Sequence, residues 1–370
     1  MIYLHIPFCR QACVYCDFHF NTSLRYVTEV TDAMHREIEL RKTEIPKKIN
    51  SIYFGGGTPS VLNPKKIKVF IDQIEALFEL HPNAEITLEA NPDDLNDDYL
   101  KGIKEAGINR LSIGIQSFSD SALRFMNRSH DAKSGIEAVE RAFKSGIEQI
   151  SIDLIYGVPG TDNASWKQQI KMAASLPVNH LSSYSLTVES QTPLAKNIKL
   201  GKSPSPDETQ AAEQFAILQQ VAPKFGFEHY EISNLCRDGA RAIHNSSYWS
   251  GQAYLGIGPS AHSFTGKERR MNVANNMQYM KGLLNYDCPH EIELIDSTTR
   301  YHELVLTGIR TSKGIDLKSI EQTGLQHSSH FYKILEKHKP KFNLKEDKVS
   351  LKSEFWIYAE KIALDFFIEK

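Results

Sequence analysis

The chain has 370 residues, of which 41% are hydrophobic and 24% are charged, and its formal net charge is −2. The length is that expected for one large and one small domain, and the composition is ordinary for a globular protein. The near-neutral charge argues against nucleic acid as a partner. The sequence has no run of eighteen apolar residues to span a bilayer, and an apolar stretch begins directly at Met1, which leaves no room for a cleavable signal peptide.

The first predicted element is a strand over Ile2–Ile6, and three cysteines follow it closely at Cys9, Cys13 and Cys16. Clustered cysteines without a secretory signal indicate reduced thiols that bind metal in the cytoplasm. Three thiolates can hold three irons of a [4Fe–4S] cube and leave the fourth iron open. A small molecule can bind and be reduced at such an open iron.

Zinc is the alternative occupant of this loop. A structural zinc ion usually requires a fourth side-chain ligand, which His5, His19 or Asp17 would supply. The remaining cysteines, Cys236 and Cys288, stand alone in the sequence and are interpreted as small apolar residues.

Short β-branched runs alternate with amphipathic stretches over roughly the first 190 residues. The predicted strands are Ile2–Ile6, Ser51–Phe54, Glu85–Ala90, Arg110–Gln116, Gln149–Tyr156 and His180–Leu186. The predicted helices between them are Val27–Arg41, Pro64–Leu80, Asp94–Ala106, Ala132–Lys144 and Ser165–Ser175. Such alternation predicts parallel strands joined by helical crossovers. Six units are too few for a closed eight-unit barrel, so the predicted fold class is α/β with an open, partial (β/α)6 barrel.

Unusual motifs follow the ends of these strands, where a parallel α/β barrel keeps its chemistry. The turn Gly55–Pro59 follows the second strand, and its glycines suit positive φ angles or a close backbone approach. We interpret it either as a cradle for the amino group or carboxylate of a ligand, or as a plain strand-to-helix turn with Pro59 near the helix start. It is not a phosphate loop, because it lacks the Gly-Lys-Ser/Thr ending.

Polar residues occupy further strand ends and the loop after the fourth strand, at Glu89, Gln116, Arg128 and Asp153. A carboxylate buried at a strand end is costly unless it is paired. Glu89 would accept from an ammonium group, Arg128 would hold a carboxylate, and Asp153 would accept from ribose hydroxyls. Together they predict a pocket for a zwitterionic nucleoside, with a salt-bridge network at the barrel mouth as the structural alternative.

The regular alternation ends after about residue 190. A helix is predicted over Asp207–Phe225, followed by a loop-rich, aromatic-rich segment over Glu228–Asn275. The remainder is predicted to hold helices and one hairpin, at Ser297–Arg310, Leu317–Gln322, Ser328–Lys337, Phe342–Leu351 and Phe355–Phe367. Helix, helix and hairpin indicate a small winged-helix-like domain, although the neutral charge disfavours DNA as its partner. We expect a partial barrel at 1–205, a capping segment at 206–290 and a C-terminal helical domain at 291–370.

Three motifs carry a family resemblance: Tyr3-Leu4-His5-Ile6-Pro7-Phe8-Cys9 with the cysteine spacing, Gly55–Pro59, and Ser151-Ile152-Asp153-Leu154-Ile155-Tyr156-Gly157. On them the chain resembles the radical S-adenosylmethionine superfamily, and within it the oxygen-independent coproporphyrinogen oxidase-like family. The resemblance implies that a [4Fe–4S] cluster is ligated by Cys9, Cys13 and Cys16. It implies that S-adenosylmethionine is bound by Tyr3, Tyr15, Gly56, Gly57, Thr58, Glu89, Gln116, Arg128, Asp153 and Ser185.

The same resemblance implies a reaction. The methionine moiety would chelate the open iron, and one electron would cleave the sulfonium to methionine and a 5′-deoxyadenosyl radical. The protein would supply orientation and a water-poor barrel mouth. Whether the chain uses that radical is a separate question, so its activity as an enzyme is left open.

A further motif, His244-Asn245-Ser246-Ser247-Tyr248-Trp249, is similar to the H-N-x-x-Y-W signature of the heme chaperone branch of that family. His244 is a candidate axial ligand for heme iron, and the two aromatic residues could stack on the porphyrin. The structural alternative is a loop histidine held by its neighbours. His229 and His262 are rival ligands.

The branch implies a heme chaperone that binds heme, the cluster and S-adenosylmethionine and delivers heme to respiratory hemoproteins. It leaves open a homodimer and a peripheral contact with a membrane through those partners. The alternative function is an oxygen-independent coproporphyrinogen III dehydrogenase of heme biosynthesis. Members of that kind carry a fourth cysteine where this chain has Phe18, and an N-terminal extension that this chain lacks before Tyr3. A radical enzyme with an unrelated substrate is the third hypothesis.

Overall fold

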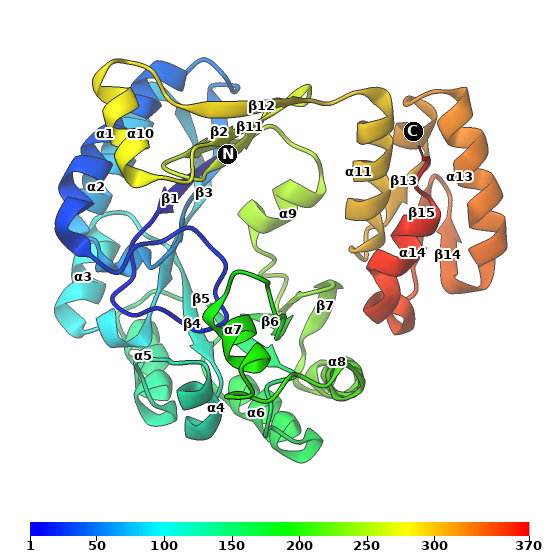
Figure 1. The fold of residues 1–370 in the computed structure, drawn as a ribbon, viewed down its shortest axis with the longest axis horizontal. Coiled ribbons are helices and arrows are strands. Elements are labelled where there is room, and N and C mark those ends of the chain that lie inside the picture. Colours follow the sequence, from blue (N-terminus) through cyan, green and yellow to red (C-terminus); the bar gives the residue numbers. More distant parts are fainter. Residues whose placement is uncertain (370) are drawn as a thin grey trace.

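A computed structural model describes residues 1–369. It consists of a large α/β body and a smaller, mostly helical C-terminal unit (Figure 1). The segment around β12 (His290–Leu294) leads from one part to the other. The cysteine loop and the strand-end motifs all lie in the large body.

A nine-stranded sheet forms the centre of the large body, in the order β7-β8-β6-β5-β4-β3-β2-β1-β9. Strands β1, β4 and β5 have the predicted bounds, and β6 is one residue shorter. Strands β2 and β3 begin earlier than predicted, because their exposed polar ends pair with each other from Lys48 and Glu79 onward. The six central strands run parallel and in sequence order: β1 Ile2–Ile6, β2 Lys48–Gly56, β3 Glu79–Ala90, β4 Arg110–Gln116, β5 Gln149–Tyr156 and β6 His180–Ser185.

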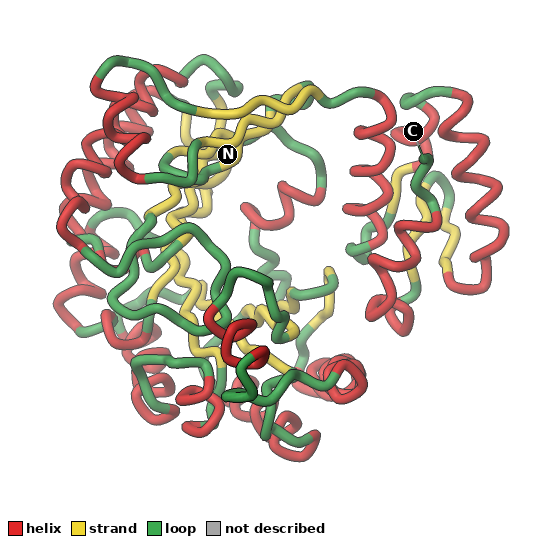
Figure 2. Tube along the Cα trace, viewed as in Figure 1, coloured by secondary structure: helices red, strands yellow, loops and turns green. Residues whose placement is uncertain are grey.

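Helices cover the outer side of these strands (Figure 2). They are α1 Val27–Arg41, α2 Pro64–Leu77, α3 Asp97–Glu105, α4 Asp120–Phe125, α5 Ala132–Lys144 and α6 Asn163–Ser175. Four of them begin where a side-chain oxygen accepts a backbone N–H of the first turn, from Asn63, Asn96, Asp131 and Asp162. Helix α4 was not predicted, since it is a six-residue helix between β4 and the longer α5.

The sheet does not close within residues 1–369, because β7 (Glu228–Glu231) and β9 (Leu255–Ile257) are its two end strands. Strand β9 lies parallel to β1, whereas β8 (Asn234–Cys236) lies antiparallel to β6 and to β7. The prediction of an open, partial barrel is therefore confirmed. The three added strands come from the aromatic-rich segment, where three- and four-residue strands give no clear periodicity.

Alternation along the strands separates a core surface from the barrel interior. On β1, Ile2, Leu4 and Ile6 are fully buried in the main hydrophobic core under the helices. Tyr3 and His5 lie between them and point the other way, into the interior. The same alternation on β2 to β5 directs a set of polar side chains inward: Ser51, Tyr53, Glu89, Ser112 and Asp153.

The segment between the barrel and the C-terminal unit adds short elements around the sheet. A three-stranded antiparallel sheet, β10-β11-β12, packs beside β9. Helix α8 ends before its predicted limit, because the chain tightens into a 3-10 turn that Gly226 ends with a φ of 82°. The bounds are α7 Pro193–Lys199, α8 Glu208–Val221, α9 Ile243–Trp249, β10 His262–Phe264, β11 Glu268–Asn272 and α10 Asn276–Leu284.

The C-terminal unit contains the predicted helices and hairpin. Its core includes the buried rings of Tyr301, Phe331 and Phe366. The last predicted helix is a 3-10 helix over Ser353–Tyr358 followed by α14, and the domain boundaries stay a prediction. The bounds are α11 Ser297–Ile309, β13 Ile315–Asp316, α12 Leu317–Glu321, α13 Leu325–His338, β14 Phe342–Lys345, β15 Lys348–Leu351 and α14 Ala359–Asp365.

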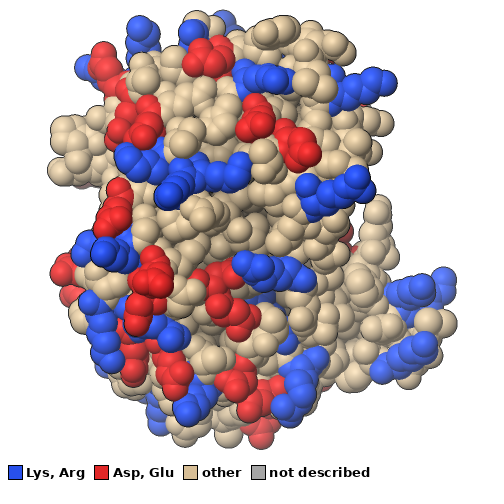
Figure 3. Space-filling view, turned by 90° about the vertical axis from the view of Figure 1, so that its left-hand side faces the viewer, with Lys and Arg blue, Asp and Glu red and all other residues tan. Residues whose placement is uncertain are grey.

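Two surface features complete the description. No helix within residues 1–369 is long and apolar enough to cross a membrane. Lys and Arg side chains alternate with Asp and Glu over the face that carries the outer helices (Figure 3). This mixture agrees with the net charge of −2.

Candidate metal centre and cofactor pocket

The cysteine loop leaves β1 and is anchored by backbone hydrogen bonds. The N–H of Cys9 donates to the carbonyl of Asn21 over 3.1 Å, and the N–H of Asn21 donates to the carbonyl of Pro7 over 2.9 Å. Further along, the N–H of Val14 donates to the carbonyl of Met126 over 3.2 Å. The loop is therefore fixed at the carboxyl end of the sheet, between β1 and the end of α4.

The three loop cysteines are free thiols, and they lie close enough for the charges of Cys9 and Cys13 to act on Cys16. Thr58 Oγ1 donates to Cys9 Sγ over 3.3 Å, and Arg128 Nη1 donates to Cys13 Sγ over 3.2 Å. Burial, with the charges of Cys13 and Cys9, raises the pKa of Cys16 to about 11. Burial also raises the pKa of Cys9. Since burial opposes ionisation of the Cys9 and Cys16 thiols, a cationic partner such as iron would stabilise their thiolates.

The zinc alternative depends on a fourth ligand, and two of its three candidates already have other partners. The ring of His5 bonds through Nδ1 to Tyr3 Oη at 3.1 Å and through Nε2 to the carbonyl of His19 at 2.9 Å. His19 Nε2 bonds to Asn276 Oδ1 at 2.8 Å. These contacts favour the iron–sulfur interpretation over a zinc site.

The glycine turn after β2 packs directly against the cysteine loop. A Cβ atom on Gly57 would lie 2.7 Å from the carbonyl oxygen of Phe8, and Gly56 has a φ of 105°. The N–H of Gly57 donates to the carbonyl of Ile6 over 2.9 Å, and that of Thr58 to the carbonyl of Phe8 over 2.7 Å. Because these donors are engaged, the turn can offer a ligand carbonyl oxygens, which suit an amino group rather than a carboxylate.

Two carboxylates lie in the barrel interior next to this turn. Tyr53 Oη donates to Glu89 Oε1 over 2.7 Å, and Ser112 Oγ donates to Asp153 Oδ1 over 3.4 Å. Burial, together with the charge of Asp153, raises the pKa of Glu89 to about 8. Burial raises the pKa of Asp153 to about 6. Both groups are thus poised to accept hydrogen bonds from a ligand that brings donors or positive charge.

Arg128 links the cysteine loop to the polar interior. Its Nη2 donates to Asn91 Oδ1 over 2.7 Å and to the carbonyl of Gly114 over 2.8 Å, while Nη1 reaches Cys13 Sγ. Its Nε is buried and has no partner within residues 1–369. A buried, unpaired guanidinium N–H beside the cysteines is suited to a ligand carboxylate.

The other predicted cofactor residues surround the same interior. Gln116 ends β4 with a φ of 64°, and its Nε2 would lie 3.0 Å from a Cβ atom placed on Gly114. The Tyr3 ring stacks at 6.1 Å from that of Tyr53. The hydroxyl of Tyr15 bonds to Cys13, and Ser185 bonds to Tyr156 at the ends of β6 and β5.

Three residues of this pocket were missed from the sequence: Tyr53, Asn91 and Ser112. Each bonds directly to a predicted residue, namely Glu89, Arg128 and Asp153. Tyr53 and Ser112 could have been found from strand alternation, since they lie on the inward-facing positions of β2 and β4. Asn91 directly follows the end of β3 at Ala90.

Comparison with known proteins identifies the family. The Radical SAM superfamily profile matches residues 3–173. A Bacillus subtilis protein named heme chaperone HemW is 35% identical over 321 residues, which cover 85% of this chain and 84% of that protein. Its Mycobacterium tuberculosis namesake is 33% identical over 85% of this chain and 83% of its own length. The chain belongs to the HemW family of radical SAM proteins.

The chain is also similar to a mitochondrial protein and to a solved enzyme structure. Radical S-adenosyl methionine domain-containing protein 1, mitochondrial, from Bos taurus is 30% identical over 85% of this chain and 74% of that protein. Escherichia coli coproporphyrinogen III oxidase, HemN, superposes with a TM-score of 0.82 over 99% of this chain and 89% of that chain, at 23% identity. This likeness confirms the fold class.

Membership of the radical SAM superfamily implies a [4Fe–4S] cluster and S-adenosylmethionine. The free thiols of the cysteine loop and the unpaired Arg128 Nε suit these two groups in their chemistry. Cys9, Cys13 and Cys16 would hold the cluster, which supplies one electron at low potential when bound. Arg128 Nε would take the methionyl carboxylate, and Glu89 with the turn carbonyls would take the amino group. The ribose would lie toward Asp153 and Ser185 at the ends of β5 and β6. These assignments stay predictions.

The histidine of the predicted heme motif, His244, does not lie on an open surface. His244 is 1% exposed on α9, where Nδ1 bonds to Ser51 Oγ at 2.9 Å and Nε2 bonds to Tyr248 Oη at 3.1 Å. Its ring centroid lies 4.9 Å from that of Tyr53, beneath the cofactor pocket. Burial lowers the pKa of His244 to about 3. Neither ring nitrogen is open to heme iron in this arrangement, which matches the structural alternative, although the residue lies on a helix rather than a loop.

The rival histidines differ from each other in exposure. His229 is half-buried, packs edge-on to the Trp356 ring at 4.8 Å, and bonds through Nε2 to the carbonyl of Ile232 at 3.1 Å. His262 is exposed on β10. Heme ligation by any of these histidines stays a prediction.

Proposed function

We propose that the chain is a heme chaperone that carries a [4Fe–4S] cluster and S-adenosylmethionine. The observation that carries this function is the 30–35% identity, over about 85% of the chain, to relatives of which several bacterial members are named heme chaperones. The intact cysteine loop and the unpaired Arg128 Nε support the two cofactors.

The acceptors of the heme would be respiratory hemoproteins. The chain would act in the cytoplasm, where thiols that must bind iron stay reduced. Contact with a membrane would then come through the acceptor, and two copies of the chain would form a homodimer. Size-exclusion chromatography with light scattering, with and without the reconstituted cluster, tests the dimer.

An oxygen-independent coproporphyrinogen III dehydrogenase is the second candidate, and the intact cofactor pocket favours it. Phe18 counts against it, because it stands where the resemblance places a fourth cysteine. Its side chain is 70% exposed. One experiment separates the two. The chain is reconstituted anaerobically, then given hemin in one sample and coproporphyrinogen III with S-adenosylmethionine and a reductant in another.

The chaperone proposal expects a stoichiometric Soret band with hemin and unchanged coproporphyrinogen. If protoporphyrinogen forms and hemin is not stably bound, the dehydrogenase function is the correct one and the chaperone function is not. A radical enzyme with another substrate would show neither result but would release methionine from S-adenosylmethionine.

A further inference from the structure

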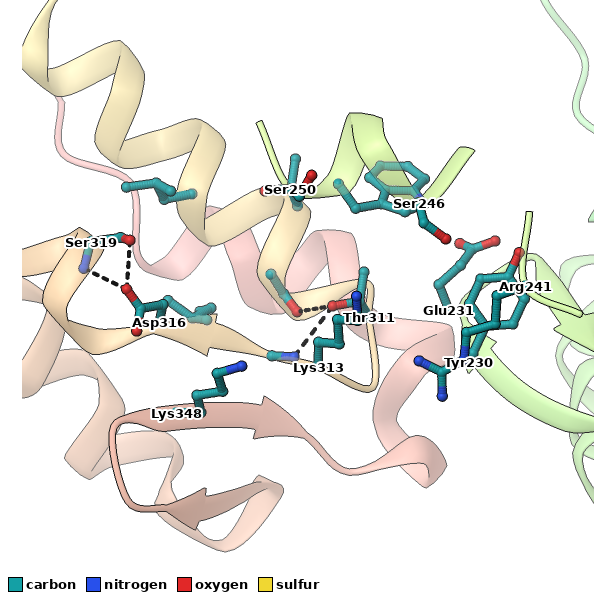
Figure 4. A pocket seen from close by; sticks show the side chains of 16 residues that line it. Tyr230, Glu231, Arg241, Ser246, Ser250, Thr311, Lys313, Asp316, Ser319 and Lys348 are labelled. Carbon is teal, nitrogen blue, oxygen red and sulfur yellow. Dashed lines mark hydrogen bonds between the residues drawn. The ribbon is translucent and has the colours of Figure 1, made fainter. Parts of the chain in front are cut away.

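A cavity of about 240 Å³ lies between the barrel and the C-terminal unit (Figure 4). The two parts meet beside it through backbone hydrogen bonds: the N–H of Ile232 donates to the carbonyl of Arg310 over 2.9 Å, and that of Ser312 to the carbonyl of Tyr230 over 3.0 Å. One wall comes from α9 and β7, and the other from α11, β13 and β15. The cavity is therefore a place where both parts of the chain would contact one ligand.

Helix α9 has two faces with different surroundings. His244 and Tyr248 face the barrel interior and bond to each other. Ser246 and Trp249 line the cavity, and Ser246 Oγ and Trp249 Nε1 are buried without a partner within residues 1–369. Two orphaned donors on one wall indicate that a polar ligand completes this site.

The opposite wall carries positive charge. Lys313 and Lys348 are exposed at the cavity, and no ion pair is found for either in the described chain (Figure 4). The nearby acidic groups are engaged elsewhere. Asp316 accepts from Ser319 N over 2.9 Å and from Ser319 Oγ over 2.6 Å.

The remaining charged groups of the cavity are also engaged. Glu231 is fully buried and accepts from the N–H of Ser233 over 3.2 Å. Arg241 pairs with Glu228 and lies over the Tyr230 ring. Glu231 and Asp316 keep their negative charge, but with Arg241, Lys313 and Lys348 the lining has three cationic and two anionic side chains, a formal excess of one positive charge.

We propose that this cavity receives the carboxylate-bearing edge of heme, with the propionates on Lys313 and Lys348 and the macrocycle against Trp249. The assignment rests on the proposed chaperone function. A flat apolar ring with two carboxylates at one edge matches an indole beside two unpaired ammonium groups. The volume is below the 300–1,000 Å³ usual for enclosed ligands, so it fits one edge and not the whole tetrapyrrole.

The site differs from ligation by the signature histidine. Heme on His244 would require breaking its bonds to Ser51 and Tyr248. The start of α9 is held separately by Glu85, which accepts the N–H groups of Ile243 and His244 over 2.8 and 2.9 Å. Binding at the cavity leaves these contacts intact, so His244 is a positioning residue for α9.

The test is a hemin titration of the full chain, reconstituted anaerobically, followed by Soret absorbance and by quenching of tryptophan fluorescence. The double variant Lys313→Glu/Lys348→Glu is expected to weaken hemin binding about tenfold, because two attractive pairs become repulsive. The matched control, Lys333→Glu/Lys337→Glu on exposed positions of α13, is expected to bind within twofold of the parent chain.

Hemin dimethyl ester identifies the carboxylates as the contact. The parent chain should prefer hemin to the ester, and the cavity variant should bind both alike. Equal hemin binding by the cavity and control variants would overturn the assignment. If the parent chain binds no hemin, the proposed chaperone function itself is contradicted.

Discussion

Glu89 is a buried carboxylate whose ionisation should affect stability. Burial raises its pKa from about 4.5 to about 8. Between these values the folded chain holds a proton that the unfolded chain has lost, so rising pH favours unfolding until it passes about 8. In this range the free energy of unfolding falls by up to about 1.4 kcal/mol per pH unit.

Glu89→Gln is therefore expected to flatten the pH dependence of the chain without S-adenosylmethionine. Between pH 6.5 and 7.5 the variant should lose about 1 kcal/mol less free energy of unfolding than the parent chain. Urea unfolding at both pH values measures this, with Glu291→Gln on the exposed β12 as the control. Parallel pH profiles for Glu89→Gln and the parent would contradict the prediction.

Cys13 is predicted to be a cluster ligand, since its sulfur lies beside the Arg128 guanidinium at the barrel mouth. Cys13→Ser should remove the visible absorption and most of the iron of the reconstituted chain, because the third thiolate of the cube is lost. Cys236→Ala, a buried cysteine on β8, should retain both. Iron content, measured by inductively coupled plasma spectrometry, shows whether Cys13 is a cluster ligand. Unchanged iron in Cys13→Ser would refute the predicted set of ligands.

Arg128 should matter for S-adenosylmethionine more than for iron. Arg128→Lys removes the unpaired Nε and the planar fork while keeping a positive charge. The expected result is about tenfold weaker binding of S-adenosylmethionine in calorimetry, with normal iron content. Arg36→Lys, at an exposed position of α1, is the control. Normal affinity in Arg128→Lys would remove this residue from the pocket.

The turn after β2 is the element on which the cysteine loop depends. In Gly57→Ala the new Cβ would meet the backbone carbonyl of Phe8 at 2.7 Å, so neither partner can move aside cheaply. We expect a loss of 1–3 kcal/mol in the free energy of unfolding together with poor iron incorporation.

The control for this prediction is Gly135→Ala in α5, where a Cβ would meet side-chain atoms alone, the end of Ile115 at 3.3 Å and the His130 ring at 3.4 Å. This variant should fold and bind iron normally. Denaturant unfolding and iron content are measured for both. A stable, iron-loaded Gly57→Ala chain would show that the close approach is not required.

Elements with their own periodicity could be predicted from the sequence. Strands β1, β4 and β5 and helices α1 and α5 have the predicted bounds, because their apolar residues alternate or recur on one face. Helix α9 could not be predicted, since its first N–H groups are capped by Glu85 of β3, 158 and 159 residues away. A cap supplied by a distant strand leaves no local signal.

The candidate site could be predicted wherever a motif ends a strand. The cysteines, the glycine turn, Glu89 and Asp153 are brought together because the carboxyl ends of parallel strands share one edge of the sheet. The role of His244 could not be seen, because residue type does not reveal that Ser51 and Tyr248 occupy both ring nitrogens.

At the scale of the whole molecule, α9 connects two sites. Its inner face lies under the cofactor pocket, where the His244 ring approaches Tyr53, the partner of Glu89. Its outer face, at Trp249, lines the cavity shared with the C-terminal unit. Helix α9 therefore lies between the predicted cofactor pocket and the proposed heme site.

The measurement that tests the central claim most directly is heme transfer. The reconstituted chain, loaded with one equivalent of hemin under anaerobic conditions, is mixed with an apo-hemoprotein of the respiratory chain, and the Soret band is followed over time. The account predicts that the band shifts to that of the acceptor faster than with free hemin bound to albumin. Transfer no faster than from albumin, or conversion of coproporphyrinogen III by the same preparation, would contradict it.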